Sequence, residues 1–484
     1  MFNWKSIGKI IGILLLLNAI FMLTTIPFTL IERDGDLRAV LISAWITATF
    51  AAILLQSSKN PKSSDLRKRD GFLVVTLGWL GMSLFGTLPY MISGAIPNFS
   101  DAFFETISGF STTGATILTD IESVHKGILF WRSLTQWIGG MGIIVLTVAI
   151  LPFLGIGGMQ LFVAEAPGIT PDKLQPRIKE TAKRLWFIYL GLTLTEMVLL
   201  WVSGMSFFDA INHALTTMAT GGFSTHNESI AAFSSPLIQY IIILFMFLAG
   251  TNFTMTYFGL HGQFLKVLKN EEFRFYLGFC LGISLVVGFI IFGLGHDALE
   301  KSIRDALFQV VSVITTTGYI THDYTAWTPF ITVLFFMLMF FGASAGSTAG
   351  GVKIVRHILL VRNSILELKR QIHPSAIIPV RFNGQTVSRE IIYNILAFIM
   401  IYFSVFGIGS ILIAMTGVDF MTAVGATATC LGNIGPGLGS VGPVDNFAHM
   451  PMAAKWLLSF LMLLGRLELF TVLLIFTPYF WRKT

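Results

Sequence analysis

Four stretches of this chain share one pattern: an aspartate opens a short apolar segment, which runs into a turn rich in threonine and glycine. In the first three stretches the aspartate precedes a glycine by 13 residues, and the fourth begins at Asp419 and contains CLGNIGPG. Each stretch lies between two long hydrophobic segments. A helix–loop–helix unit repeated four times in one chain predicts a pore with pseudo-fourfold symmetry. The equally spaced pairs are Asp101 and Gly114, Asp209 and Gly222, and Asp305 and Gly318.

Composition places this fourfold unit in a membrane. Of the 484 residues, 54% are hydrophobic and 12% are charged, whereas soluble domains contain about 25% charged residues. Many apolar runs reach the roughly 20 residues that are needed to cross a bilayer. The sequence therefore predicts an all-α polytopic membrane protein without a large soluble domain, surrounded by membrane lipid.

The hydrophobic segments predict an N-terminal helical hairpin followed by four parallel repeats of helix, pore loop and helix around the pseudo-fourfold pore. Together they make ten full spans and four half-helices. The expected segments are 10–30 and 39–56 in the hairpin; 71–93, 100–111 and 127–151 in repeat one; 185–204, 208–220 and 236–260 in repeat two; 274–295, 302–316 and 328–357 in repeat three; and 390–416, 419–431 and 453–480 in repeat four.

Domain boundaries follow from this threading. The hairpin and a basic linker take up 1–70, and repeats one to four take up 71–164, 165–261, 262–361 and 362–484. Most of the 32 Lys and Arg residues then fall on one side of the membrane. The positive-inside rule makes that side cytoplasmic, with both termini in the cytoplasm. Such basic clusters indicate topology rather than binding to nucleic acid.

The half-helices are too short to cross a bilayer. Non-helical backbone at membrane depth is tolerated where it lines a water-filled path or is buried in protein, so the four loops are pore candidates. The alternative is four re-entrant caps in which aspartate caps the start of each helix and glycine its end. Repetition at four matching positions favours the pore. The expected N-caps are Asp101, Asp209, Asp305 and Asp419.

Carbonyl dipoles at the ends of these half-helices suit a cation that has lost its water shell. Glycine lets carbonyl groups turn toward an axis, because it accepts backbone angles that other residues resist. The fourth repeat departs from the regular spacing, since 13 residues after Asp419 stands Gly432. Aligning the loops instead places Gly435 level with Gly114, and we favour that alignment while Gly432 stays open.

The loop motifs ISGFSTTGAT, ATGGFSTH, TTTGY and NIGPGLG, the preceding hairpin and the stretch GASAGSTAGG resemble the Trk/Ktr/HKT superfamily of potassium uptake proteins. The similarity to bacterial Trk membrane subunits extends over essentially the whole chain. It implies potassium uptake across the bacterial inner membrane by a homodimer, in which each protomer has its own pore. It also implies regulation by a cytoplasmic nucleotide-binding ring protein of the Trk A type.

The resemblance further implies a K⁺ selectivity filter with one short glycine turn in each repeat. In related plant proteins a serine in the first repeat accompanies sodium preference, so Gly114 favours potassium over sodium. We call the filter residues the four triplets. They are Thr112, Thr113 and Gly114; Thr220, Gly221 and Gly222; Thr316, Thr317 and Gly318; and Asn433, Ile434 and Gly435.

The second span of repeat three is interrupted by ten small residues, 342–351, which we call the glycine-rich loop. Each glycine costs a helix about 1 kcal/mol relative to alanine. Close helix packing through small residues is one explanation; a flexible gate below the filter is the other, and the resemblance implies it. The stretch lacks the G-x-x-x-x-G-K-[ST] pattern of a phosphate-binding loop. The predicted gate residues are Gly342, Gly346, Gly350, Gly351 and Lys353.

Three charged residues lie within predicted membrane segments. Arg466 stands in the middle of a span, where a lone arginine costs roughly 2.5–3.5 kcal/mol, so it should face protein or water. It is either in a structural salt bridge or, as the resemblance implies, near the pore below the filter, where it tunes cation throughput. For Glu105 and Glu196, a structural role is the favoured interpretation.

Enzymatic motifs are not found in the sequence. It contains no Walker motif, no DKTG context and no His spacing typical of a metal site. The predicted ligand is K⁺, with Na⁺ as a further candidate, and no organic cofactor is expected. The alternatives are a Na⁺- or H⁺-coupled potassium symporter and a less selective K⁺/Na⁺ permease. A symporter built from inverted repeats is disfavoured, because these repeats run parallel.

Overall fold

The computed structural model describes residues 2–32, 35–59, 67–140, 142, 178–295, 298–373, 376 and 378–482. Those residues are helical apart from loops and one small antiparallel hairpin, β1 Arg381–Phe382 and β2 Gln385–Thr386. Six helices among them are long and apolar enough to cross a membrane, or up to eight if each of two bent pairs is one span. The chain is therefore an all-helical, multi-span membrane protein.

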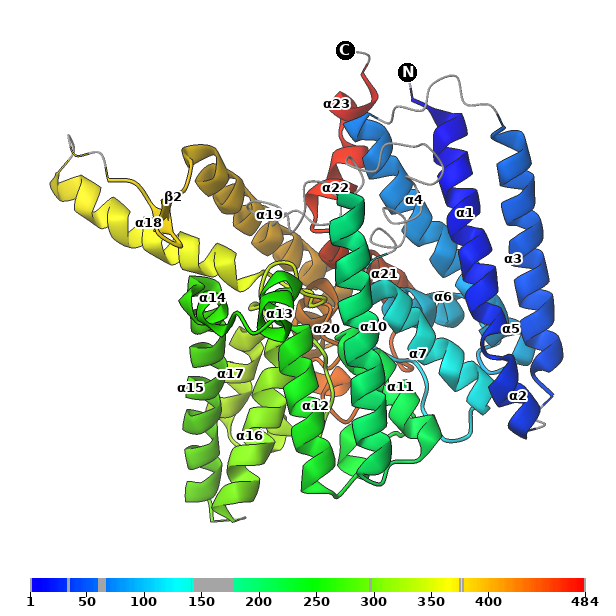
Figure 1. The fold of residues 1–484 in the computed structure, drawn as a ribbon, viewed down its shortest axis with the longest axis horizontal. Helices are drawn as coiled ribbons and strands as arrows, with labels where there is room; N and C mark the ends of the chain where they lie inside the picture. Colours follow the sequence, from blue (N-terminus) through cyan, green and yellow to red (C-terminus); the bar gives the residue numbers. More distant parts are fainter. Residues whose placement is uncertain are drawn as a thin grey trace.

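The N-terminal hairpin forms as expected. Helix α1 (Trp4–Leu23) continues after a two-residue break into α2 (Ile26–Glu32), and α3 (Leu37–Ser57) returns beside α1. Figure 1 shows this pair, in blue, at one side of the molecule. Small buried side chains such as Ala44 and Ala51 line the face of α3 that meets the protein.

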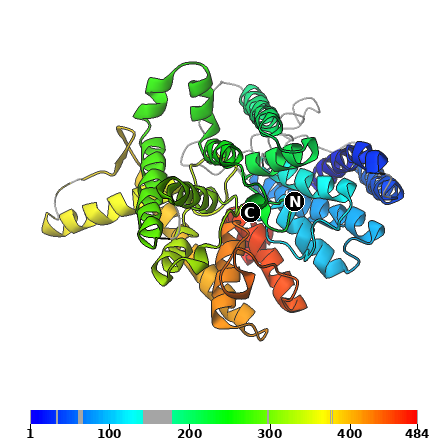
Figure 2. The same cartoon turned by 90° about the horizontal axis from the view of Figure 1, so that it is seen from below.

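The four repeats follow one another around a centre in sequence order, as the succession of colours in Figure 2 shows. Each contains a short helix that ends near this centre, which we call the pore helix.

Repeat one comprises α4 (Lys68–Gly86), α5 (Leu88–Ser93), pore helix α6 (Phe99–Phe110) and α7 (Lys126–Gly140), and repeat two comprises α10 (Ile178–Val202), pore helix α11 (Phe207–Met218), η2 (Ser229–Ala232), α12 (Pro236–Ala249) and α13 (Phe253–Leu260). Repeat three comprises α14 (Phe264–Lys269), α15 (Glu271–Gly293), pore helix α16 (Leu299–Ile314), η3 (Tyr324–Ala326), α17 (Pro329–Leu338) and α18 (Ile354–Ile372). Repeat four comprises α19 (Arg389–Ala414), pore helix α20 (Phe420–Gly432), η4 (Gly439–Val441), α21 (Met452–Arg466), α22 (Phe470–Leu473), η5 (Leu474–Phe476) and α23 (Pro478–Trp481).

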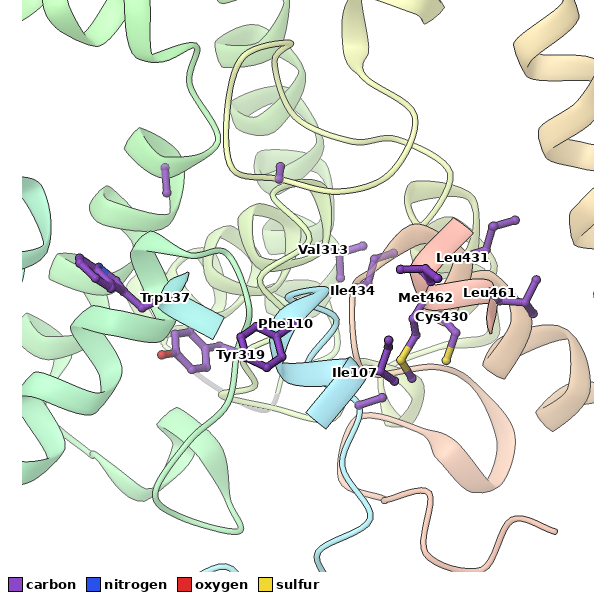
Figure 3. Close-up of a cluster of buried hydrophobic side chains, with 14 of the residues drawn as sticks. Ile107, Phe110, Trp137, Val313, Tyr319, Cys430, Leu431, Ile434, Leu461 and Met462 are labelled. Atoms are coloured by element: carbon purple, nitrogen blue, oxygen red, sulfur yellow. The ribbon is translucent and has the colours of Figure 1, made fainter. Parts of the chain in front are cut away.

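The core of the protein surrounds the pore helices. Every residue of α6 from Ala102 to Phe110 is buried, and Figure 3 shows part of this core, with Ile107 and Phe110 of α6 and Leu431 of α20. The outer spans α3, α15 and α19 instead expose large apolar side chains. Such exposure suits helices that face lipid, where apolar surface is not penalised.

Three of the four expected N-caps are wrong. Asn98 caps α6 by accepting from the backbone N–H of Ser100 and Asp101, and Ser206 caps α11. These two helices therefore begin two residues before their aspartates, which lie in the first turn, where a carboxylate still interacts favourably with the helix dipole. Helix α16 begins at Leu299, so Asp305 lies inside it; Asp419 is the N-cap of α20.

Of the ten full spans expected, the described residues show six, or up to eight if each bent pair is one span, because the second helix of several repeats is broken. The angle between α12 and α13 is 113°, and that between α21 and the segment Phe470–Phe476 is 112°. Carbonyl oxygens of Ala249 and Gly250, at the end of α12, accept hydrogen bonds from the glycine-rich loop instead of continuing a helix. In repeat one, α7 is described to Gly140, and the rest of the expected span 127–151 lies outside the described residues.

Repeat three departs furthest from the expected span 328–357. Helix α17 ends at Leu338, and the chain is non-helical until α18 begins at Ile354. Figures 1 and 2 both show α18, in yellow, projecting away from the body of the molecule. The expected domain boundary at 361/362 therefore falls inside a continuous helix.

Candidate functional site

The four triplets adopt one backbone conformation. Their first residues all have a left-handed φ, from 53° to 57°, and the glycines that end them have a φ of 76° to 100°. Gly435 belongs to this set, whereas Gly432 is the last residue of α20. The left-handed first residues are Thr112, Thr220, Thr316 and Asn433.

A shared hydrogen bond ties each triplet to its pore helix. The backbone N–H of the residue before the glycine donates to a carbonyl five residues earlier, at 2.9–3.0 Å in all four repeats. This bond is typical of a helix ending in a Schellman motif, which requires the left-handed residue before it. The donors and acceptors are Thr113 and Ser108, Gly221 and Thr216, Thr317 and Ser312, and Ile434 and Thr429.

The triplets meet in a closed ring. A methyl group added at Gly114 would lie 2.2 Å from the carbonyl oxygen of Gly221 in repeat two. The same contact continues from Gly222 to Thr317 at 1.8 Å, from Gly318 to Ile434 at 1.9 Å, and from Gly435 back to Thr113 at 2.8 Å. Distances this short exclude any side chain, so each triplet needs glycine to approach the next one.

The side chains of the triplets face protein. The hydroxyl groups of Thr113 and Ser111 are 2.7 Å apart, and those of Thr317 and Thr315 are 2.8 Å apart. The amide of Asn433 donates to Thr113 Oγ1 at 2.9 Å. Backbone carbonyl groups, together with the nearby C-terminal ends of the pore helices, are therefore the groups that an ion would meet at the ring.

A polar side chain nine residues before the glycine braces the loop of repeats one to three. Glu105 accepts from the Thr116 hydroxyl at 2.9 Å and from Ile117 N at 2.9 Å. His213 Nε2 lies 2.9 Å from Ser224 Oγ, and Gln309 Nε2 donates to the carbonyl oxygen of His322 at 3.0 Å. Sequence reasoning missed His213 and Gln309, although the constant spacing would have aligned both of them with Glu105.

Helix α7 supplies a second brace that the sequence did not reveal. Gln136 Nε2 donates to the carbonyl oxygen of Gly221 at 2.6 Å, and Gln136 Oε1 accepts from Phe223 N at 3.0 Å. Arg132, one turn earlier on the same face of α7, pairs with Glu105 at 2.7 Å. In the sequence, these two polar residues stand four apart in an otherwise apolar segment, and that spacing could have indicated the brace.

Glu196 of α10 is also fully buried, and its carboxyl oxygens lack hydrogen-bond partners among the described residues.

The glycine-rich loop lies against the C-terminal ends of three pore helices. The Thr348 hydroxyl donates to the carbonyl oxygens of Met218 at 3.0 Å and Ala249 at 3.2 Å. The backbone N–H of Gly350 donates to Thr316 Oγ1 at 2.7 Å. A methyl group added at Gly350 would lie 2.7 Å from the carbonyl oxygen of Gly432. The loop therefore packs directly beneath the triplets, on the side opposite the pore-helix N-termini.

Two of the loop's glycines have the left-handed φ that favours glycine, 72° at Gly346 and 65° at Gly351. Gly342 N donates to the Val352 carbonyl oxygen at 2.7 Å, which closes the loop on itself. Lys353 is buried, and its ammonium group donates to the carbonyl oxygen of Ala349 within the loop.

Arg466, at the end of α21, joins the loop to repeat one. Its guanidinium donates to the carbonyl oxygen of Thr348 at 2.8 Å and to that of Gly140 at 3.0 Å. Glu468, two residues later, pairs with Arg356 of α18. Thus the structure places the predicted gate residues and Arg466 together, on one side of the ring of triplets.

Acidic residues on the pore-helix side have partners within the protein. Glu122 contacts His226 at 3.5 Å, and Asp120 accepts from Ser123 N at 3.2 Å. The hydrogen bond from Arg304 lowers the pKa of Glu300, which keeps that carboxylate charged.

Comparison with known proteins covers the whole of this architecture. The family model for TrkH, described as a cation transport protein, matches residues 37–299 and 296–483. The Trk system potassium uptake proteins TrkH of Salmonella typhimurium LT2 and of Escherichia coli K12 are each 42% identical to the chain over 486 residues, which covers 99% of this chain and all of theirs. The crystal structure of the potassium transporter TrkH from Vibrio parahaemolyticus matches with a TM-score of 0.89 at 38% identity, over 99% of this chain and all of that one.

Proposed function

The chain belongs to the TrkH family of cation transport proteins, and on that premise we propose that it takes up potassium through the ring formed by its four triplets. As a member of a transporter family, it is not an enzyme. Potassium is its transported substrate and is not changed chemically. The ion leaves most of its water at the ring and is held there by backbone carbonyl oxygens.

The single observation that supports this proposal is the closed set of contacts between glycines and carbonyl groups. Each of the four glycines approaches the carbonyl oxygen of the next repeat so closely that a Cβ atom does not fit. Four carbonyl groups from four repeats are thereby brought to one level. A filter for a monovalent cation needs this arrangement, because the carbonyl oxygens must replace the water around the ion.

The glycine-rich loop acts as the gate in this proposal. It lies directly below the ring. Hydrogen bonds made by backbone groups, by the Thr348 hydroxyl and by neighbouring side chains, among them Glu272, hold it. The loop's own side chains are small, so its displacement requires mainly the breaking of these hydrogen bonds. Arg466 holds the loop through the carbonyl oxygen of Thr348 and adds a positive charge below the ring, which limits how long a cation stays there.

Topology and partners complete the proposal. The side of the ring that carries the glycine-rich loop faces the cytoplasm, together with both termini, in the bacterial inner membrane. The transporter is a homodimer with one pore in each protomer, and a cytoplasmic nucleotide-binding ring protein of the Trk A type controls the gate. These points follow from the family resemblance and from the distribution of basic residues.

Reversal potentials in proteoliposomes test the proposal. The purified full chain is reconstituted under opposed gradients of potassium, sodium and protons. A reversal potential that follows the potassium Nernst potential supports a passive, selective filter. Displacement by the proton gradient indicates coupled symport, and displacement by the sodium gradient indicates either coupling to sodium or a permease of low selectivity. The absence of any potassium current under all gradients contradicts the proposal.

A further inference from the structure

The four junctions between neighbouring loops are held by different chemistry. The Tyr319 hydroxyl of repeat three donates to the carbonyl oxygen of His213 in repeat two at 3.1 Å. The Tyr324 hydroxyl of repeat three donates to the carbonyl oxygen of Gly437 in repeat four at 3.2 Å. Phe447 N of repeat four donates to the carbonyl oxygen of Thr116 in repeat one at 2.8 Å. These three contacts beside the ring are neutral hydrogen bonds; the ion pair between Lys455 of repeat four and Asp101 of repeat one lies at the other end of α6.

At the junction between repeats one and two, a buried ion pair within repeat one reaches the loop of repeat two. Glu105 of α6 and Arg132 of α7 are 0% and 2% exposed, and their closest atoms are 2.7 Å apart. Arg132 Nη1 also donates to the carbonyl oxygen of Ser224 at 2.9 Å, and the guanidinium lies 3.6 Å from the centre of the Phe223 ring.

The pair contacts equivalent segments of two neighbouring loops, just after the glycine that ends each triplet. Glu105 binds the second and third residues after Gly114, and Arg132 contacts the first and second residues after Gly222. Gly114 and the Gly221 carbonyl group approach each other at this junction. Displacing either segment therefore moves one side of the ring relative to the other.

Buried charges make this brace stiff. A carboxylate and a guanidinium out of contact with water are held by each other and by their hydrogen bonds, and separating them leaves two unpaired charges in a medium of low polarity. The planar guanidinium also fixes direction, because its N–H groups form a rigid fork.

We propose that the Glu105–Arg132 ion pair is a specificity-determining brace of the filter. Neither residue contacts the ion; together they position the triplets of repeats one and two, and the preference for potassium over sodium depends on that position. This inference rests on the proposed potassium uptake through the ring.

The test replaces the pair with apolar side chains of similar volume, as Glu105→Leu with Arg132→Met. Such replacements of buried ion pairs are often neutral or stabilising, so this double variant keeps the fold while losing the brace. The full-length variant is reconstituted, and its potassium-to-sodium permeability ratio is measured with its melting temperature in detergent. We expect the ratio to fall about tenfold while the melting temperature is retained.

Arg132→Lys is measured in parallel, because lysine keeps the buried charge but cannot hold Glu105 and Ser224 together with one planar group. If the double variant does not accumulate in the membrane, the permeability ratio of Arg132→Lys still tests the brace. An unchanged permeability ratio in either folded variant overturns the inference.

Asp101→Asn is the matched control. It breaks the other ion pair of the same pore helix, Asp101 with Lys455 at 2.7 Å, at the end of α6 away from the ring. We expect its permeability ratio to equal that of the unmodified protein; an equal fall in this control would also overturn the inference. If the unmodified protein itself shows no preference for potassium, the proposed function fails rather than the brace.

Discussion

Left-handed residues at the head of each triplet are the feature that most distinguishes this chain at the scale of single residues. Thr112, Thr220 and Thr316 are β-branched, and such residues rarely adopt a positive φ. Strained backbone of this kind costs about 1–3 kcal/mol per residue and persists where surrounding contacts hold it. Here the repeated bond from triplet to pore helix supplies those contacts. The strained conformation aligns the four loops at one level.

Gly114→Ala tests the ring at this scale. Alanine would place its Cβ 2.2 Å from the Gly221 carbonyl oxygen, so we expect potassium transport to be lost while the protein still accumulates in the membrane. Gly94→Ala is the control, because Gly94 has the same φ of 81° but no atom within 4 Å of the added carbon. Both variants carry about 1–2 kcal/mol of backbone strain, so equal loss of uptake in the two would refute the steric argument.

Broken inner helices set the arrangement at the scale of elements. The end of α12 gives its carbonyl groups to the glycine-rich loop, and α21 ends at Arg466, whose guanidinium reaches the same loop. A regular helix would have used those carbonyl groups internally. The inner helices therefore break at the point where the glycine-rich loop inserts between them. Their ends in turn hold the loop at that level.

Thr348→Val tests whether this loop controls transport. Valine keeps the shape of the side chain but removes the hydroxyl that donates to Met218 and Ala249. Losing these bonds should loosen the loop by about 1 kcal/mol, so we expect uptake of rubidium or potassium to rise about fivefold. Thr195→Val in the outer span α10, which loses only a bond to its own helix at Gly191, should leave uptake unchanged. Equal uptake in the two variants counts against the gate.

Asp419, the N-cap of α20, makes a pH-dependent contribution to stability. Hydrogen bonds from the Thr422 side chain and backbone lower the pKa of Asp419 below the ordinary value of 3.8. A lowered folded-state pKa means that this contribution is present above pH 3.8 and is lost as the pH falls through the folded-state pKa. We expect Asp419→Ala to cost about 1 kcal/mol at neutral pH, and Asp419→Asn to keep the cap but remove its pH dependence. Thermal unfolding in detergent between neutral and acidic pH measures both.

Both termini meet at one end of the whole molecule. The rings of Phe2 and Phe480 stack 5.5 Å apart, and Asn3 N donates to Asp70 Oδ1 at 3.1 Å, so α1, α4 and α23 are joined there. The pore-helix N-termini lie at the opposite end (Figure 1). This arrangement fixes which positions share a side of the membrane.

Thiol labelling tests that arrangement. The native Cys280 and Cys430 are buried and free, so they should not react with a membrane-impermeant reagent. We expect Tyr479→Cys to be labelled from the cytoplasmic side and Val444→Cys from the outer side, since these residues are 74% and 69% exposed at opposite ends. Labelling of both from one side would contradict the topology.

The sequence alone determined the class of the molecule, its fourfold repetition and the residues that form the ring. Hydrophobic runs of spanning length and an equally spaced motif are local properties, so they can be read along the chain. The same constant spacing also contained His213 and Gln309, but their role depends on which loop their side chains reach.

Only the tertiary structure decided where the helices break and what braces the ring. The turn from α12 to α13 depends on a loop almost 100 residues later in the chain, and the Glu105–Arg132 brace depends on Ser224 in another repeat. Helix caps shifted for a related reason, because Asn98 and Ser206 offered side-chain acceptors before the expected aspartates. Apolar periodicity indicates which faces of a helix are buried, but it does not indicate which distant groups form hydrogen bonds with each other.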